Sequence, residues 1–260
     1  MIIDTLVIEV TRRCNMACEH CLRGCSQNVD IPFETIDRIF EGVQEVYSLT
    51  FTGGEPFLNI DAIEYTLKYV KEHCIPVHSV FVVTNGKHFE ERYITVMNEW
   101  IMYVTSFNIN LDAKLECGDT IWEIDELSNY SGLAVSRDPY HEQIPLENYI
   151  RYRLLSYYSE VKEREDYNGS IILEGNAYEN GLIGQEREGD KFDFYDWEVE
   201  DFEIGEDKTV SLVYVSCLGE VLADCDRSYE HMAEESIGNI NEYSLLELFR
   251  FYALNEEAVA

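Results

Sequence analysis

Strand-like and helix-like segments alternate through the first hundred residues, and this alternation limits the possible folds more than any other feature. Apolar strand-like runs at 5–10, 48–54 and 79–86 are separated by helical apolar stripes at 32–47 and 60–73. The connections between them are short, which favours parallel βα units with helices packed over a sheet. The sequence therefore predicts an α/β fold.

The pattern continues less regularly in the second hundred residues. Periodicity predicts a helix near 89–99, a strand at 132–138, a helix at 147–164 and a strand at 170–176. Segment 100–131 contains one strand-like and one helix-like stretch, and we assign neither.

The composition changes after residue 183. Segment 184–208 is strongly acidic, and we expect a linker with short antiparallel strands. Segment 209–226 alternates like a hairpin around Gly219, and 244–254 has a helical stripe. The predicted division is a barrel-like domain at 1–183, an acidic linker at 184–208 and a small C-terminal α+β appendage at 209–260.

The chain is strongly acidic, with 51 Asp and Glu against 19 Lys and Arg and a formal net charge of −32. Such a charge repels phosphate backbones and anionic lipid surfaces, which argues against general nucleic-acid binding and against a membrane partner. The N-terminal stretch "MIIDTLVIEV" is typical of a strand rather than a signal peptide. We therefore expect a cytoplasmic protein, and a basic peptide or cationic small molecule is compatible with its charge.

Three of the eight cysteines follow the first predicted strand directly. Cys14, Cys18 and Cys21 have the spacing C-x3-C-x2-C. Loops at the carboxyl ends of parallel strands are where α/β folds place their chemistry. Clustered cysteines in a reducing compartment bind metal or perform redox chemistry. Three thiolates can bind three irons of a cubane cluster and leave the fourth iron open.

Two other uses of these cysteines stay open from the residues alone. A structural zinc ion could be completed by His20 or Cys25, because zinc normally takes four protein ligands. A closed four-cysteine cluster with Cys25 would make an iron–sulfur electron-transfer protein. Either use would place the chain in a different class, without the reactive open iron.

A second distinctive stretch, "FTGGEPF" at 51–57, follows the second predicted strand. Gly53 and Gly54 let bare backbone approach a ligand closely. Glu55 offers a carboxylate to an ammonium group, and Pro56 stiffens the turn.

Together, the cysteine triplet after the first strand and "TGGEP" after the second resemble the radical S-adenosylmethionine (radical SAM) enzymes. The resemblance implies a partial (β/α)6 barrel in which Cys14, Cys18 and Cys21 bind a [4Fe–4S] cluster. It also implies that one electron from the cluster cleaves SAM to a 5′-deoxyadenosyl radical, which takes hydrogen from a substrate. His20 stands where the family usually has another aromatic residue.

The resemblance extends to further contacts with SAM. In "AVSRDPYHE" (134–142), a hydroxyl and a carboxylate suit the ribose hydroxyls, and "NINLDA" (108–113) is the competing segment. The implied residues are Gly53, Gly54 and Glu55 for the methionine amino group, Thr84 and Asn85 at the third strand, and Ser136 with Asp138 at the fourth, with Asn110 and Asp112 as the alternative. No residue is assigned as a catalytic acid or base.

The C-terminal part resembles the SPASM or twitch segments of peptide-modifying radical SAM enzymes, through Gly219, Cys225, "GNI" and "SLLELF". Only Cys217 and Cys225 are local there, and a cubane needs four thiolates, so an auxiliary cluster is not expected. The resemblance favours a peptide substrate, with a small molecule or nucleoside as the alternative. A reductant such as flavodoxin or ferredoxin is the implied second partner.

Overall fold

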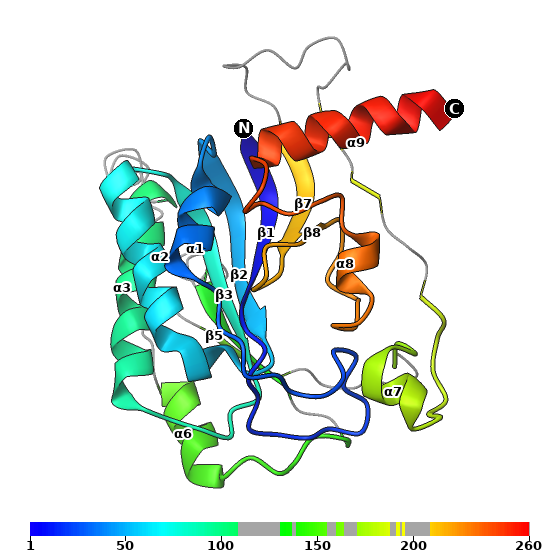
Figure 1. The fold of residues 1–260 in the computed structure, drawn as a ribbon. Helices are drawn as coiled ribbons and strands as arrows, with labels where there is room; N and C mark the ends of the chain where they lie inside the picture. Colours follow the sequence, from blue (N-terminus) through cyan, green and yellow to red (C-terminus); the bar gives the residue numbers. More distant parts are fainter. Residues whose placement is uncertain are drawn as a thin grey trace, which may run out of the picture.

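One sheet runs through the chain, and its first five strands lie side by side in sequence order. The structure is a computed structural model that describes residues 1–108, 131–136, 139–154, 160–163, 171–187, 191–192, 194–195 and 209–259. The sheet order is β5-β4-β3-β2-β1-β7-β6, with β8 paired to β7 (Figure 1). The parallel strands are β1 (Ile2–Thr11), β2 (Glu45–Gly53), β3 (Val77–Thr84), β4 (Ser131–Val135), β5 (Glu160–Glu163) and β7 (Thr209–Val215).

The parallel arrangement determines where the loops lie. Because β1 to β4 run in the same direction, the segments that follow them meet at one edge of the sheet. Those segments contain the cysteine triplet, Gly53–Glu55, Thr84–Asn85 and Ser136.

Helices cover the sheet on both sides. In Figure 1, α1, α2 and α3 lie on one side of the sheet, and α7 and α8 lie on the other. None of the helices in the described part of the chain is long and apolar enough to cross a membrane. The helical elements are α1 (Phe33–Phe40), the short 3-10 helix η1 (Pro56–Asn59), α2 (Ile60–His73), α3 (Glu91–Asn108), α6 (Leu146–Leu154), α7 (Gly175–Glu179), α8 (Met232–Glu235) and α9 (Leu245–Val259).

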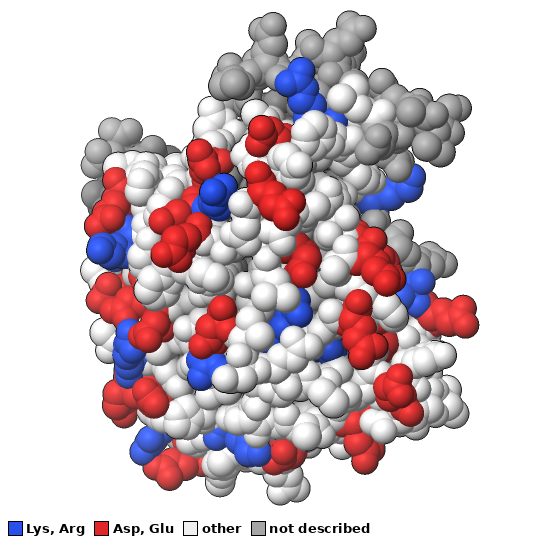
Figure 2. Space-filling view, in the orientation of Figure 1, with Lys and Arg blue, Asp and Glu red and all other residues white. Residues whose placement is uncertain are grey.

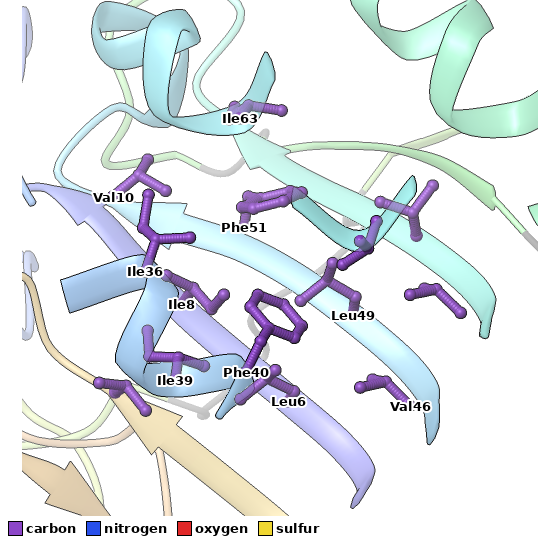
Figure 3. Packing of buried hydrophobic residues seen from close by; sticks show 14 of the residues in the cluster. Leu6, Ile8, Val10, Ile36, Ile39, Phe40, Val46, Leu49, Phe51 and Ile63 are labelled. Atoms are coloured by element: carbon purple, nitrogen blue, oxygen red, sulfur yellow. The ribbon is translucent and has the colours of Figure 1, made fainter. Parts of the chain in front are cut away.

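The core lies between the sheet and the first helices. Figure 3 shows Leu6, Ile8 and Val10 of β1 beside Ile36 and Phe40 of α1, and all five are buried. The second half of β1 is buried on both faces, as expected for a central strand of a parallel sheet. Burial of this kind, at about 25 cal/mol per Å² of apolar surface, is the main term that holds the strand ends in place.

The predicted helix at 32–47 is wrong in its second half. Helix α1 ends at Phe40, and Gly42 turns the chain with φ +79°. Strand β2 begins at Glu45, and Val46 pairs with Ile3 of β1. The apolar residues there fit either periodicity, and pairing with β1 decides in favour of a strand. The prediction at 60–73 is confirmed as α2.

Two predictions in the middle of the chain also need correction. The helix predicted at 147–164 is confirmed only for α6, because Glu160–Glu163 form β5 beside β4. The strand predicted at 170–176 is wrong, because Gly175 begins α7 and Ile172 makes only an isolated bridge to Gln185.

The C-terminal part joins the same sheet. As predicted, β7 and β8 (Val221–Leu222) form a hairpin around Gly219, which has φ +92°. Strand β7 also pairs with β1 in parallel, and β6 (Phe194–Tyr195) pairs with β7 antiparallel. The division into barrel, linker and appendage stays a prediction.

Candidate functional site

The segment that follows β1 forms a closed loop, here called the cysteine loop (residues 12–29). Its ends are joined by hydrogen bonds from the Arg12 N–H to the Val29 carbonyl (2.8 Å) and from the Gln27 N–H to the Arg12 carbonyl (3.0 Å). Three of its thiols are half-buried and one is exposed: Cys14, Cys18 and Cys21 in the first group, and Cys25 in the second. The three half-buried thiols are therefore partly shielded from solvent and still accessible to a ligand.

Three thiols gather in the cysteine loop, and such a donor set is suited to iron–sulfur chemistry. Within the described residues, which include the whole cysteine loop, no three His, Cys, Asp or Glu side chains converge closely enough to hold one metal ion. In a cubane each thiolate binds a different iron, so the three thiols suit the [4Fe–4S] group that the sequence predicts.

The glycine pair packs directly on the backbone of the cysteine loop. The Gly54 N–H donates to the Thr11 carbonyl (2.8 Å), and the Glu55 N–H donates to the Arg13 carbonyl (2.7 Å). A Cβ on Gly53 would stand 2.3 Å from the Thr11 oxygen, and one on Gly54 would stand 2.4 Å from the Arg13 oxygen. Only glycine permits this approach, so the segment after β2 is held against the residues that precede Cys14.

Glu55 joins the ends of β2 and β3. Its side chain is 1% exposed. Its carboxylate accepts hydrogen bonds from the Phe57 N–H (3.2 Å), the Thr84 hydroxyl (2.8 Å) and the Asn85 N–H (2.7 Å). The carboxylate thus has a structural task, in addition to the contact with an amino group that the sequence predicts.

Asn85 extends this connection to the cysteine loop. Its Nδ2 donates to the Asn15 Oδ1 (2.8 Å) and lies 3.7 Å from the Cys14 sulfur. Lys87 adds a bond from its Nζ to the Asn15 carbonyl (2.8 Å). Sequence reasoning missed Asn15 and Lys87. The sequence offers one indication for them: each comes shortly after the end of a predicted strand.

The buried Glu55 predicts a pH-dependent stability. Burial raises the pKa of Glu55 from 4.5 to about 7, although its three hydrogen bonds partly offset this effect. The folded state thus binds this proton more tightly than the unfolded state does. Its contribution to the free energy of unfolding is complete below about pH 4.5 and is lost as pH rises through about 7, a change of about 3 kcal/mol.

Urea unfolding of the metal-free protein between pH 4.5 and 8 checks this prediction. Glu55→Gln should lack that part of the pH dependence, and Glu41→Gln, at an exposed helix end, controls for loss of an acidic residue. Parallel profiles for wild type and Glu55→Gln would contradict the prediction.

The end of β4 meets the same edge. The Ser136 N–H donates to the Thr84 carbonyl (2.8 Å), and Ser136 lines a pocket of about 400 Å³ together with His141 and Tyr149. The His20 ring lies 4.8 Å from the His141 ring and 5.2 Å from the Tyr140 ring. Asp138, Asn110 and Asp112 lie outside the described residues, so the ribose contact stays a prediction.

The other flank of the cysteine loop rests on α7. The Asn176 Nδ2 donates to the Cys18 carbonyl (3.1 Å), and its N–H donates to the Cys21 carbonyl (2.9 Å). Figure 1 shows α7 beside the loop that follows β1. The pattern at 170–176 predicts a strand, so the sequence does not indicate the contact between α7 and the cysteine loop.

A buried polar group links the cysteine loop to the C-terminal part. Glu9 of β1 accepts hydrogen bonds from the Arg12 Nε (3.1 Å) and the Cys217 N–H (3.0 Å). The Arg12 guanidinium lies 4.5 Å from the centre of the Tyr229 ring. The Tyr229 N–H donates to the Arg23 carbonyl (3.1 Å). The segment after β8 therefore supports the loop directly.

Comparison with known sequences points to the same family as the sequence motifs do. The family model described as "Radical SAM superfamily" matches residues 8–113. An uncharacterized protein of Methanocaldococcus jannaschii, MJ0907, is 32% identical over 120 residues, which are 45% of this chain and 41% of that protein. A protein of the same organism named "Putative glycyl-radical enzyme activating enzyme MJ1227" is 32% identical over 98 residues, 35% of this chain and 38% of that one. The matches thus span about two fifths of these relatives.

Comparison with solved structures supports the fold. The structure of anSMEcpe with bound AdoMet and a peptide named Kp18Cys has a TM-score of 0.55 and 15% identity, over 96% of this chain and 80% of that chain. The same protein with AdoMet alone gives 0.53 and 14%, over 96% and 81%. At this identity the likeness concerns the fold alone, and it confirms the predicted α/β partial barrel.

Proposed function

We propose that this chain, whose residues 8–113 match the family model described as "Radical SAM superfamily", binds a [4Fe–4S] cluster and cleaves SAM reductively. Members of this superfamily are enzymes, and the family uses a [4Fe–4S] cluster and SAM. Cys14, Cys18 and Cys21 would hold the cluster. Gly53–Glu55, Thr84, Asn85, Ser136 and Asp138 would contact SAM.

One observation carries the proposal. The three-thiol loop and the Gly53–Glu55 segment lie against each other, and Asn85 bonds to both Glu55 and Asn15. The two motifs are more than 30 residues apart in the chain, and their contact is what a shared cofactor site requires. A closed electron-transfer cluster or a zinc site would need no such glycine-lined partner.

When bound, the cluster and SAM supply the electron transfer and the radical chemistry. The residues of the chain position these groups. Hydrogen bonds to Glu55 hold the ends of β2 and β3 in one arrangement. Preorganised side chains of this kind lower the cost of bringing reactants together.

The test is anaerobic reconstitution with iron and sulfide, followed by dithionite and SAM. We expect 5′-deoxyadenosine and methionine to form, as measured by liquid chromatography. A reconstituted protein that keeps its iron and yields no 5′-deoxyadenosine would contradict the proposal.

We further propose that the substrate is a peptide. The C-terminal resemblance favours one. The name of MJ1227 says that it activates another enzyme, and the anSMEcpe structure holds a bound peptide. The net charge of −32 favours a basic partner. Acidic side chains are spread over the face in Figure 2 with basic ones between them, so we expect a general attraction rather than one acidic docking patch.

Peptide mixtures of matched length test this substrate class. A Lys- and Arg-containing mixture should increase 5′-deoxyadenosine formation over the substrate-free rate, and an Asp- and Glu-containing mixture should not. Stimulation by a nucleoside mixture instead would favour the alternative substrate class.

A further inference from the structure

Helix α7 is a neighbour of the cysteine loop that the predicted cluster ligands and SAM contacts do not include. Helix α7 lies about 150 residues later in the chain, yet its Asn176 touches the loop at three points. Its Nδ2 donates to the Cys18 carbonyl (3.1 Å), its N–H donates to the Cys21 carbonyl (2.9 Å), and its Oδ1 lies 3.9 Å from the Cys25 sulfur. Asn176 thus bonds to the carbonyls of two proposed cluster ligands, to Cys18 through its side chain and to Cys21 through its backbone.

The backbone on both sides is shaped for this contact. Gly175 has φ +51°, and a Cβ there would stand 2.4 Å from the Leu22 carbonyl oxygen and 2.5 Å from the Gly24 nitrogen. Gly24 itself has φ +87°. Two glycines in the left-handed region allow α7 to approach the loop more closely than other residues could.

Helix α7 is also held by residues of the C-terminal part. Ala177 is fully buried, and Glu174 accepts hydrogen bonds from the Ser228 N–H (3.2 Å) and from the His231 Nδ1 (2.9 Å). The C-terminal part therefore helps to hold α7 in position against the cysteine loop. A helix that short has little stability alone.

We infer that Asn176 is a positioning residue for the cysteine loop, a role that rests on the proposed cluster site. It holds the peptide groups of Cys18 and Cys21 so that their thiols face the cluster. Partners that orient metal ligands without binding the metal typically contribute about 10–100-fold to metal affinity. The C-terminal part would also contribute to cluster retention, because Ser228 and His231 hold Glu174 at the start of α7.

The experiment compares Asn176→Ala and Asn176→Asp with wild type. Aspartate keeps the size but cannot donate to the Cys18 carbonyl. Asn241→Ala is the matched control, because the Asn241 Nδ2 donates to the Leu218 carbonyl (3.1 Å), away from the cysteine loop. Both Asn176 variants should release iron from the reduced, SAM-free protein to a chelator about tenfold faster than wild type.

A second readout uses the metal-free protein and does not depend on the cluster. Hydrogen–deuterium exchange should rise at residues 18–24 in Asn176→Ala and stay unchanged in Asn241→Ala. Unchanged exchange, or iron release at the wild-type rate, would overturn the inference. If wild type takes up no iron, the proposed function fails, while the exchange data still decide whether Asn176 holds the loop.

Discussion

Replacing Cys14, Cys18 or Cys21 with alanine is expected to abolish SAM cleavage, whereas Cys25→Ala should leave it near the wild-type rate. In the proposed site each of the three thiols would bind a different iron, so the loss of one would expose the cluster to dissociation. When residues act as one unit, the loss of any one of them removes nearly all of the activity. We therefore expect 5′-deoxyadenosine formation to fall on the order of 10³-fold or more. Iron content should fall in the same three variants.

The matched control is informative because Cys25 lies in the same loop. It is exposed, and its sulfur is 3.9 Å from the Asn176 Oδ1. If Cys25→Ala loses iron as completely as the other variants, the cluster is closed by four cysteines and the electron-transfer alternative is favoured. Retained iron in Cys14→Ala, Cys18→Ala and Cys21→Ala would argue against the site altogether.

Gly54→Ala is expected to weaken SAM binding strongly. The new Cβ would stand 2.4 Å from the Arg13 carbonyl oxygen, 2.8 Å from the Arg13 carbonyl carbon and 3.0 Å from the Arg12 oxygen. These are backbone atoms of the cysteine loop and cannot rotate away. Forcing extra atoms into such a contact costs about 1–3 kcal/mol. If the displaced backbone costs SAM about 2.7 kcal/mol of binding free energy, the Kd for SAM rises about 100-fold.

Anaerobic calorimetric titration of the reconstituted protein with SAM measures this effect. Gly42→Ala is the control, because its Cβ would meet nothing within 4 Å although its φ is +79°. That variant should lose stability through backbone strain and still bind SAM. A Gly54→Ala protein that binds SAM within threefold of wild type would show that this close contact does not shape the site.

The sequence was most informative where structure depends on local pattern. Helix α2 carries buried apolar residues at helical spacing, and its range at 60–73 was predicted correctly. The cysteine triplet and the Gly53–Glu55 segment are also local, because each motif occupies only a short stretch of the chain. Local motifs of this kind indicate which chemistry to expect before any contact is known.

The errors arose where long-range pairing overrides the local pattern. Val46 was assigned to a helix, but it lies opposite Ile3 in the sheet. Glu160–Glu163 were assigned to a helix, but they pair with β4. In each case a strand partner far along the chain supplies the hydrogen bonds, and periodicity does not contain that information.

The same reason explains the site residues that the sequence did not indicate. Asn176 meets Cys18 across 158 positions, and the Cys217 N–H meets Glu9 across 208. Asn15 and Lys87 follow strand ends and gain their role only because β1 and β3 end at the same edge of the sheet. Topology brings these residues together, and no spacing rule within one segment predicts it.

In the proposed site, three cysteines would hold a cluster whose remaining iron binds SAM. Electron paramagnetic resonance of the dithionite-reduced, reconstituted protein tests it most directly, with spectra recorded before and after addition of SAM. We predict the signal of a reduced [4Fe–4S] cluster whose g values shift when SAM is added. A cluster signal that saturating SAM leaves unchanged would contradict the claim.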